Sequence, residues 1–308
     1  MSAEVETAVY YREPAWHGLG IVCEEAMDSK KALELSGLDW TVDSVDFDVQ
    51  GIKAEGWKAN VRSSDKKLLG IVSDKYKIVQ NADAFAFTDA LIGNGVTYES
   101  AGSLFEGKKV WMLAKLPEVK IVDDKVVPYI CFVNNHDGKG AVRVLMTPVR
   151  VVCNNTLNLA LETTPRSWSA RHMGSIESRL EEAKDTLFQA NKYMTDLAVK
   201  ADELANSKVT DDDVAKILNK VFPIEVDDSD RVKENIKKMK DSFLSCYFAP
   251  DIMRFMNTKW GLINAAADFA DHSVPQRKTQ TYAERNMDKV INGHPVLDQV
   301  VELVSAVA

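Results

Sequence analysis

The sequence predicts an α+β fold, with an antiparallel sheet and covering helices in the N-terminal half and a long coiled-coil-like helix in a helical C-terminal half. The first half alternates apolar and polar residues with a period of two, whereas after Ser175 the apolar period is close to 3.5. The 308 residues, 45% of them hydrophobic, suffice for a sizeable core. We therefore expect a mainly β domain over residues 1–174 and a helical region over residues 175–308 that packs on it.

Strand patterns dominate residues 38–116. Residues 38–50, "LDWTVDSVDFDVQ", alternate, and residues 57–79 resemble a hairpin that turns at Ser63 to Asp65. Residues 108–116, "KKVWMLAKL", alternate again. Such alternation is typical of an antiparallel sheet with one solvated face.

Two helical patterns interrupt these strands. Residues 29–37, "SKKALELSG", have Ser29 as the expected N-cap and Gly37 as the expected end. Residues 81–95, "NADAFAFTDALIGNG", begin with Asn81, which also suits a cap. Both helices are expected to cover the sheet.

A second hairpin is predicted between residues 128 and 153. The segments "PYICFVNN" and "AVRVLMTPVRVVC" flank the tip "HDGKG", residues 136–140, whose glycines favour a reversal. Asn154 and Asn155 follow, and we expect them to turn the chain and cap a helix with a stripe at Leu157 and Leu161.

The C-terminal half begins with a long heptad-like stripe. Apolar residues recur from Ile176 to Leu204 in steps of four and three, which predicts a coiled-coil seam. Small alanines in the seam favour packing within the chain over pairing of two subunits. Further helices are predicted over residues 210–222, with Thr210 as cap, and over residues 230–248 and 261–272.

Several classes of function lack their sequence signals. The four cysteines form no CxxC pair, the five histidines show no HxH or HExxH spacing, and no glycine-rich loop continues into a phosphate-binding motif. His136, His172 and Cys153 have the residue types of a base and a nucleophile, but no nucleophile turn surrounds Cys153, so a buried thiol is the preferred interpretation. We expect no enzyme activity, no metal and no cofactor.

The cellular location of the protein is predicted from the absence of membrane and export signals. No apolar run is long enough for a membrane helix, and the acidic N-terminus does not resemble a signal peptide. A cytoplasmic protein without membrane contact is expected.

The net charge of −8 conceals a basic middle. Residues 1–50 hold 3 basic and 11 acidic residues, whereas residues 51–174 hold 17 basic and 12 acidic residues. Between residues 139 and 172 the only acidic residue is Glu162. Clustered cations of this kind are the electrostatic requirement for binding a phosphate backbone.

Cationic and aromatic side chains interleave in this basic middle, which is the mixture that contacts phosphates and stacks on bases. A solvated sheet face with tryptophan in the core remains the alternative interpretation. The expected phosphate contacts are Lys66, Lys67, Lys75, Lys77, Arg143, Arg150, Arg166 and Arg171, and the expected stacking residues are Trp57, Tyr76 and Trp168.

The chain resembles a known family in several segments, including "LGIVSDKYKIVQN", "NNHDGKGAVRVLMTPVRVVCNNTLNLAL" and "WGLINAAADFADH". They are similar to the phage/plasmid-like proteins built on domain of unknown function 932. The most specific segments are residues 149–157 and the pair Arg171 and His172, although Met173 stands where the family usually has threonine. The resemblance implies a mobile-element protein of the bacterial cytoplasm and supplies no activity. The order of elements also resembles the core of ring-forming single-strand-annealing recombinases.

Two hypotheses of different classes follow. The first is an oligomeric protein that binds single-stranded DNA and promotes annealing and recombination without ATP, because repeated shallow grooves give avidity. The second is an interaction protein that occupies a host factor for anti-defence or replication takeover, which the acidic residues 1–50 and the segment "IEVDDSD" favour.

Overall fold

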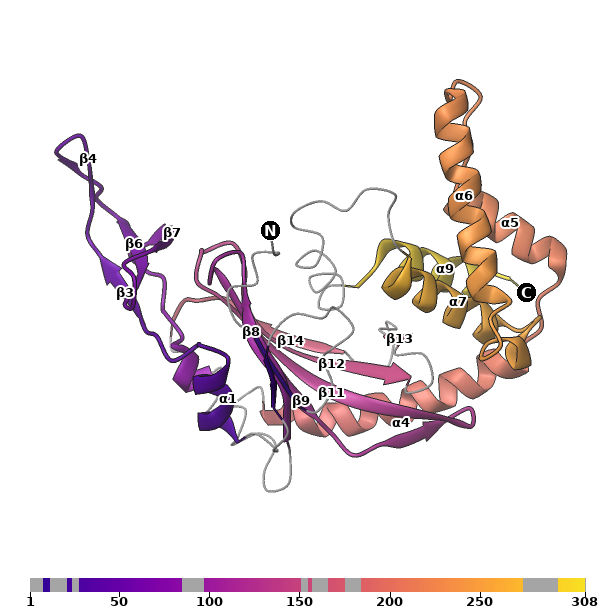
Figure 1. Cartoon of the computed structure of the whole chain (residues 1–308), viewed down its shortest axis with the longest axis horizontal. Coiled ribbons are helices and arrows are strands. Elements are labelled where there is room, and N and C mark those ends of the chain that lie inside the picture. The colour runs from indigo at the N-terminus through magenta and orange to yellow at the C-terminus, as the bar shows by residue number, and fades with distance from the viewer. Residues whose placement is uncertain are drawn as a thin grey trace.

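The structure is a computed structural model, and it describes residues 8–11, 21–23, 28–84, 97–150, 155–156, 166–174, 184–273 and 293–307. Its centre is a nine-stranded sheet in the order β13-β12-β11-β9-β8-β1-β2, with β10 paired to β11 and β14 paired to β12 (Figure 1). All neighbours are antiparallel except β1 and β2. The strands are β1 (Ala8–Tyr11), β2 (Ile21–Cys23), β8 (Thr97–Leu104), β9 (Lys109–Lys115), β10 (Val119–Ile121), β11 (Asp124–Asn135), β12 (Val142–Arg150), β13 (Asn155–Thr156) and β14 (Ser167–Ala170).

The predicted α+β class is confirmed, but the large sheet has no solvated face at its centre. On one side Met112, Phe132 and Val144 belong to the main core, and on the other side Trp111 and Cys131 belong to a second buried cluster. The alternation of "KKVWMLAKL" therefore did not separate a wet face from a dry one, because β9 and β11 are covered on both sides. The expectation of one wet face was wrong for this sheet.

A separate three-stranded sheet, in the order β3-β6-β7, is formed by residues that lie between β2 and β8 of the large sheet in the chain. It consists of β3 (Val42–Val45), β6 (Trp57–Arg62) and β7 (Leu68–Ser73). The predicted hairpin with its turn at Ser63 to Asp65 is confirmed by the β6–β7 register. The strand expected over residues 38–50 is instead broken, because β4 (Asp48–Val49) and β5 (Ile52–Lys53) form a second small hairpin.

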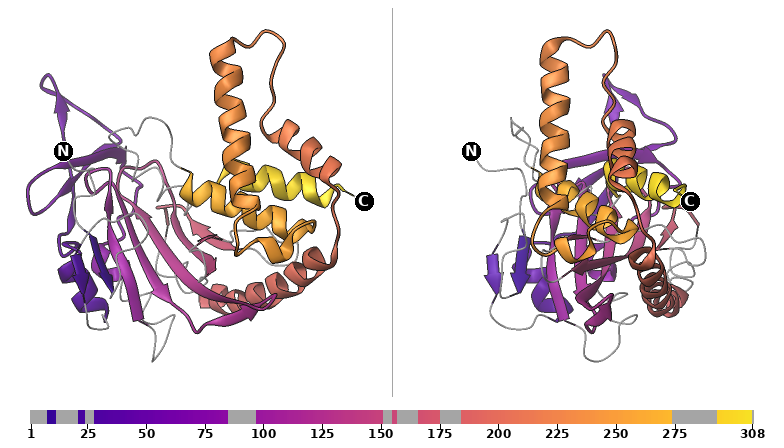
Figure 2. Two further views of the ribbon diagram at one scale, coloured as in Figure 1. Left: turned by 45° about the vertical axis from the view of Figure 1, so that its right-hand side comes forward. Right: turned by 90° about the vertical axis from the view of Figure 1, so that its right-hand side faces the viewer.

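That second hairpin projects from the body of the protein (Figures 1 and 2). Its turn residues Gln50 and Gly51 have φ values of 55° and 81°, and Asp48 Oδ1 accepts a 2.9 Å hydrogen bond from Gly51 N–H. Two consecutive left-handed residues are the geometry of a type I′ hairpin turn. We call residues 46–56 the β-arm.

The first helix, α1 (Ser29–Leu35), begins one residue earlier than the sequence suggested. Asp28, rather than Ser29, is the N-cap, and its carboxylate accepts a 2.8 Å hydrogen bond from Lys31 N–H. Gly37 follows the helix with φ 63°, as expected of a helix end. Of the second predicted helix, residues 81–84 are helical and the rest lies outside the described residues.

The helix predicted after the double asparagine also lies outside the described residues. Asn155 itself is in β13, which pairs with Val149 and Arg150 of β12, so it does not act there as a helix cap. Asn154 and Cys153 are not among the described residues.

The C-terminal helices are α4 (Lys184–Asn206), α5 (Asp211–Val221), α6 (Asp230–Tyr247), α7 (Lys259–His272) and α9 (Pro295–Ser305), with a short 3₁₀ turn η1 (Met253–Phe255). In α4 the seam residues Met194, Leu197 and Ala201 are buried in the main core. Packing of this seam within the chain is therefore confirmed for its described part. Thr210 caps α5 through a reciprocal capping box with Asp213, as the sequence predicted for the cap.

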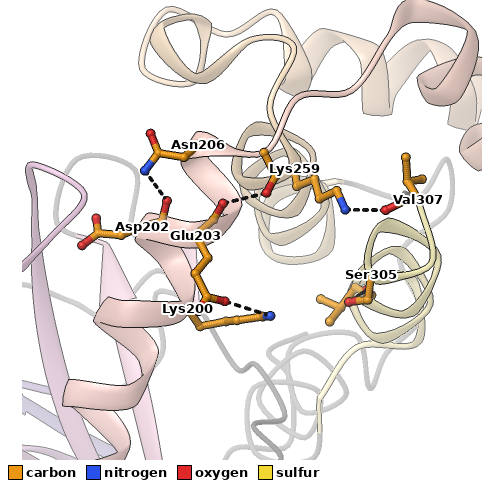
Figure 3. A network of polar contacts seen from close by, with 9 residues as sticks. Lys200, Asp202, Glu203, Asn206, Lys259, Ser305 and Val307 are labelled. Carbon is orange, nitrogen blue, oxygen red and sulfur yellow. Dashed lines mark hydrogen bonds and ion pairs between the residues drawn. The ribbon is translucent and has the colours of Figure 1, made fainter.

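The main core joins both halves of the chain, since it contains Phe132 of the large sheet together with Phe243 and Phe269 of α6 and α7. Polar contacts fasten the helix ends (Figure 3). Lys259 at the start of α7 donates its backbone N–H to Ser207 after α4 and its ammonium to the Val307 carbonyl after α9. Among the described residues no helix is long and apolar enough to cross a membrane.

Candidate nucleic-acid interface

The tip of the β11–β12 hairpin, residues 136–140, packs closely on β7. A Cβ atom placed on Gly70 would lie 2.5 Å from the Asp137 Cα, and one on Gly138 would lie 2.8 Å from Val72 Cγ1. Asn60 in β6 donates a 2.8 Å hydrogen bond from Nδ2 to the His136 carbonyl. The two sheets therefore meet backbone against backbone at this tip.

The segment after β7 is hydrogen-bonded to residues 171–174, which form a third element at the same junction. Lys77 N–H donates to the His172 carbonyl at 2.8 Å, and His172 Nδ1 donates to the Lys77 carbonyl at 2.9 Å. The Tyr76 ring stacks on the His172 ring with 4.4 Å between centroids and 13° between planes. The Tyr76 hydroxyl donates to the Asn135 carbonyl at the end of β11.

A cleft of about 400 Å³, which we call the junction cleft, opens where these three elements meet. Its volume lies in the range of small-ligand sites. Its lining residues are Trp57, Ile71, Val72, Ser73, Tyr76, Gly138, Lys139, Gly140, Ala141, Arg171, His172 and Met173.

The mouth of the cleft combines exposed apolar and cationic side chains. Trp57 is 52% exposed, and Ile71 and Met173 are about half exposed as well. Lys139 and Arg171 are exposed beside them. An aromatic plane next to a guanidinium and an ammonium can stack on a flat ring and neutralise a phosphate at the same place.

The aromatic floor of the cleft is uncharged near neutral pH. Burial lowers the pKa of His172, against the hydrogen bond to Lys77 and the charge of Asp137, which raise it. Burial also raises the pKa of Tyr76, and Asp137 adds to that shift. His172 Nδ1 carries the proton that the Lys77 carbonyl accepts, so Nε2 is unprotonated, and it is buried without a hydrogen-bond partner. Charge on the lining of the cleft comes from Lys139 and Arg171.

His136 is the first residue of the tip and is fully buried. Its Nε2 donates to Asn81 Oδ1 at 3.1 Å, because the Asn81 amide nitrogen is engaged with the Leu38 carbonyl. Burial, with a smaller contribution from His172, lowers the pKa of His136 to about 3. A neutral, enclosed imidazole of this kind holds the junction together and does not meet solvent.

Three residues that the sequence singled out come together in the junction cleft: Trp57, Tyr76 and Arg171. Lys75 and Lys77 flank Tyr76 and are exposed. These five residues therefore lie around one site, although they come from positions up to 114 apart in the chain.

The remaining predicted residues lie elsewhere. Lys66 and Lys67 follow the far turn of the β6–β7 hairpin, about 17 Å from Trp57 by strand rise. Lys66 Nζ is 3.6 Å from Asp43 Oδ2, and Lys67 Nζ is 3.2 Å from Glu106 Oε1. Both cations are thus already paired with carboxylates.

The β12–β14 region contributes inward-facing groups. Arg166 donates from Nη1 to the Met146 carbonyl at 3.0 Å, and burial lowers the pKa of this guanidinium. Trp168 packs on the main core, and Arg143 is half-buried. The Arg150 backbone pairs with Val126 at the end of β12, and its side chain lies outside the described residues.

Sequence reasoning missed three cleft residues as binding groups: Lys139, Ile71 and Met173. The tip "HDGKG" was expected to reverse the chain, which it does, but no sequence signal indicated that it would meet β7. Only this contact places Lys139 in the same cleft as Ile71 and Trp57.

The fold is thus an α+β protein with a small cationic and aromatic cleft between two sheets. A family model, domain of unknown function (DUF932), matches residues 68–291, and the chain belongs to this family. The match includes every lining residue of the cleft except Trp57, which precedes it, as does the β-arm. Comparison with curated proteins found no match, and comparison with solved structures found none.

Proposed function

We propose that the protein binds single-stranded DNA through the junction cleft and promotes ATP-independent annealing for a mobile genetic element in a bacterial cell, without acting as an enzyme. The observation that carries the proposal is the convergence of Trp57, Tyr76 and Arg171 on one cleft. An exposed tryptophan offers a stacking face to any base, so the binding is expected to be largely independent of sequence.

The cations around the cleft support binding to a strand rather than to an isolated base. Arg171 and Lys139 line the cleft, and Lys75 and Lys77 are exposed on the segment that carries Tyr76. Asp74 and Asp137 lie in the same two segments, so residues 74–77, the tip at residues 136–140 and Arg171 together hold four positive charges against two negative. A small surplus of this kind gives weak binding per subunit, which repetition in an oligomer would strengthen.

Single strands are favoured over duplex because Trp57 can stack only on a base whose face is uncovered. A base inside a duplex has both faces covered, and its extrusion costs a few kcal/mol. A single strand offers its bases without that cost. Annealing then requires only that two strands held by neighbouring subunits exchange these contacts for base pairing, with no nucleotide hydrolysis.

The test is fluorescence-anisotropy titration of labelled single-stranded and duplex oligonucleotides at several salt concentrations. For Arg171→Ala we expect weaker binding to all sequences and a slope of log K against log salt that is smaller by about 0.7, as for one lost phosphate contact on a single strand. Lys216→Ala removes the same charge from α5, which lies at the opposite end of the molecule (Figure 1), and should leave the slope unchanged.

Stacking is tested separately at Trp57. Trp57→Ala should weaken single-strand binding by about 5- to 150-fold, corresponding to ~1–3 kcal/mol for a stacked base, whereas Trp57→Phe should recover much of it. Equal binding by wild type, Arg171→Ala and Trp57→Ala would remove the junction cleft as the DNA site. Failure of the wild type to bind any oligonucleotide at low salt would remove the proposed function.

A further inference from the structure

Two exposed apolar features project from opposite ends of the molecule. The β-arm lies at one end of the long axis and α6 lies at the other (Figure 1). In the arm, Val49 and Ile52 stand directly opposite each other and are 61% and 74% exposed. In α6, Val232 and Met239 are 41% and 43% exposed.

The α6 residues continue a stripe that is buried further along the helix. Val232, Ile236, Met239 and Phe243 recur at steps of four and three, so they lie on one face. Phe243 is fully buried in the main core, Ile236 packs against that core, and the stripe emerges from it toward Val232. The outer turns of α6 therefore present an apolar strip to solvent.

The two features carry opposite charge. Residues 46–56 hold Asp46, Asp48 and Glu55 against Lys53, a net charge of −2, and Asp46 is paired with Lys53 and Lys58. Residues 230–241 of α6 hold five basic residues against Asp230, Glu234 and Asp241, a net charge of +2, and Glu234 is paired with Lys238. At 100° per residue, Lys233 and Lys240 lie on one side of the apolar strip and Arg231 and Lys238 lie on the other.

We propose that the β-arm of one copy of this chain docks on the exposed strip of α6 in a second copy. The apolar pair Val49 and Ile52 would cover Val232 and Met239, with the acidic arm lying between the flanking basic side chains. Two arms meeting each other, or two α6 helices meeting each other, would bring like charges together, which disfavours a symmetric dimer. The contact is therefore head-to-tail.

A head-to-tail contact would also bear on DNA binding, and this part of the inference rests on the proposed function. Repetition of such a contact closes a ring or extends a filament. Trp57 follows Ile52 by five residues, so a neighbouring α6 docked on the β-arm would bring its cations to the end of the molecule that carries β7 and the junction cleft. The path for a strand would then run from one subunit to the next.

The test is the mass distribution of the purified full chain without DNA, measured for wild type, Ile52→Glu, Met239→Glu and an equimolar mixture of the two variants. Wild type should form oligomers, and each variant alone should be monomeric. The mixture should form one-to-one dimers, because the intact arm of the Met239→Glu chain meets the intact helix of the Ile52→Glu chain. Val199→Glu, at an exposed position in α4, is the matched control and should assemble as wild type.

Each alternative outcome overturns the inference. A monomeric wild type would exclude the proposed contact between copies. An oligomeric Met239→Glu chain would indicate an arm-to-arm contact instead. Glu55→Lys and Arg231→Glu provide a second pair, in which each single change should weaken assembly and the double variant should restore it. Unchanged assembly with loss of DNA binding in Arg231→Glu would assign α6 to nucleic acid. Because assembly is measured without DNA, its failure is distinguishable from failure of the proposed function.

Discussion

Gly70→Ala tests whether the junction cleft depends on the backbone contact between β7 and the hairpin tip. The added Cβ would lie 2.5 Å, 2.7 Å and 2.8 Å from the Cα, O and C atoms of Asp137. Carbon atoms in contact prefer a separation of about 3.5–4.0 Å, so the tip would have to retreat by about 1 Å. No flexible side chain can yield instead, because all three atoms belong to the backbone.

The expected cost has two parts. Overpacking of this kind costs about 1–3 kcal/mol. Retreat of the tip also stretches the 2.8 Å hydrogen bond from Asn60 to the His136 carbonyl, and loss of one such bond costs about 0.5–1.5 kcal/mol. We therefore expect Gly70→Ala to lower the free energy of unfolding by about 2–4 kcal/mol.

The assay is urea unfolding followed by circular dichroism, with single-strand binding measured on the folded variant. Gly56→Ala is the control, because Gly56 has φ 76° and nothing within 4 Å of its added Cβ. That variant should lose only about 1–2 kcal/mol, the cost of a left-handed alanine. A Gly70→Ala protein as stable as wild type, with unchanged DNA binding, would refute the reasoning about the tip.

Two further outcomes can be measured by equilibrium unfolding. The pKa of His136 is lowered from 6.5 to about 3 in the fold, so below pH 6.5 the unfolded chain binds a proton that the folded chain does not. Stability should fall as the pH drops from 6.5 toward 3, by about 2 kcal/mol at pH 5 relative to pH 7, and His136→Asn should show a shallower acid limb. An acid limb of equal slope in both proteins would contradict this. Thr210→Ala should cost about 1 kcal/mol by removing the capping box of α5, whereas Thr210→Ser should cost much less, and equal midpoints for all three proteins would argue against that cap.

Several elements could be predicted from the sequence because their signals are local. The hairpin at Ser63 to Asp65 and the reversal at residues 136–140 follow from turn residues between alternating segments. The Thr210 cap follows from a hydroxyl residue before an acidic first turn. The Asp28 cap was misplaced by one residue, since Asp28 and Ser29 are both good cap residues and sequence alone does not choose between them.

Other features depend on contacts with residues far away in the chain, which no local sequence pattern indicates. The central strands β9 and β11 alternate like half-solvated strands, yet the side chains of their other face, which include Trp111 and Cys131, are buried as well. The β-arm was missed because its turn, Gln50 and Gly51, requires two left-handed residues, and glutamine is not a usual signal for that geometry.

The candidate site, too, could be predicted only in part from the sequence. The interleaving of aromatic and cationic residues was visible in the sequence, and it included Trp57, Tyr76 and Arg171, which the structure brings together in the junction cleft. It grouped with them Lys66 and Lys67, which pair with Asp43 and Glu106, and Arg166, which turns inward. Composition reports which side chains are available, but it does not report which of them are already paired.

The sequence by itself thus determined the α+β class, the order of a mainly β half followed by a helical half, the Thr210 cap, the turns at residues 63–65 and 136–140, and the stock of aromatic and basic residues. These depend on periodicity and on contacts within a few residues of the chain. Only the tertiary structure decided that the tip at residues 136–140 meets Gly70, that Tyr76 stacks on His172, and that a cleft opens between them. Those contacts join residues roughly 70 to 100 positions apart, and their geometry is set by how two sheets pack, which no periodicity in the chain encodes.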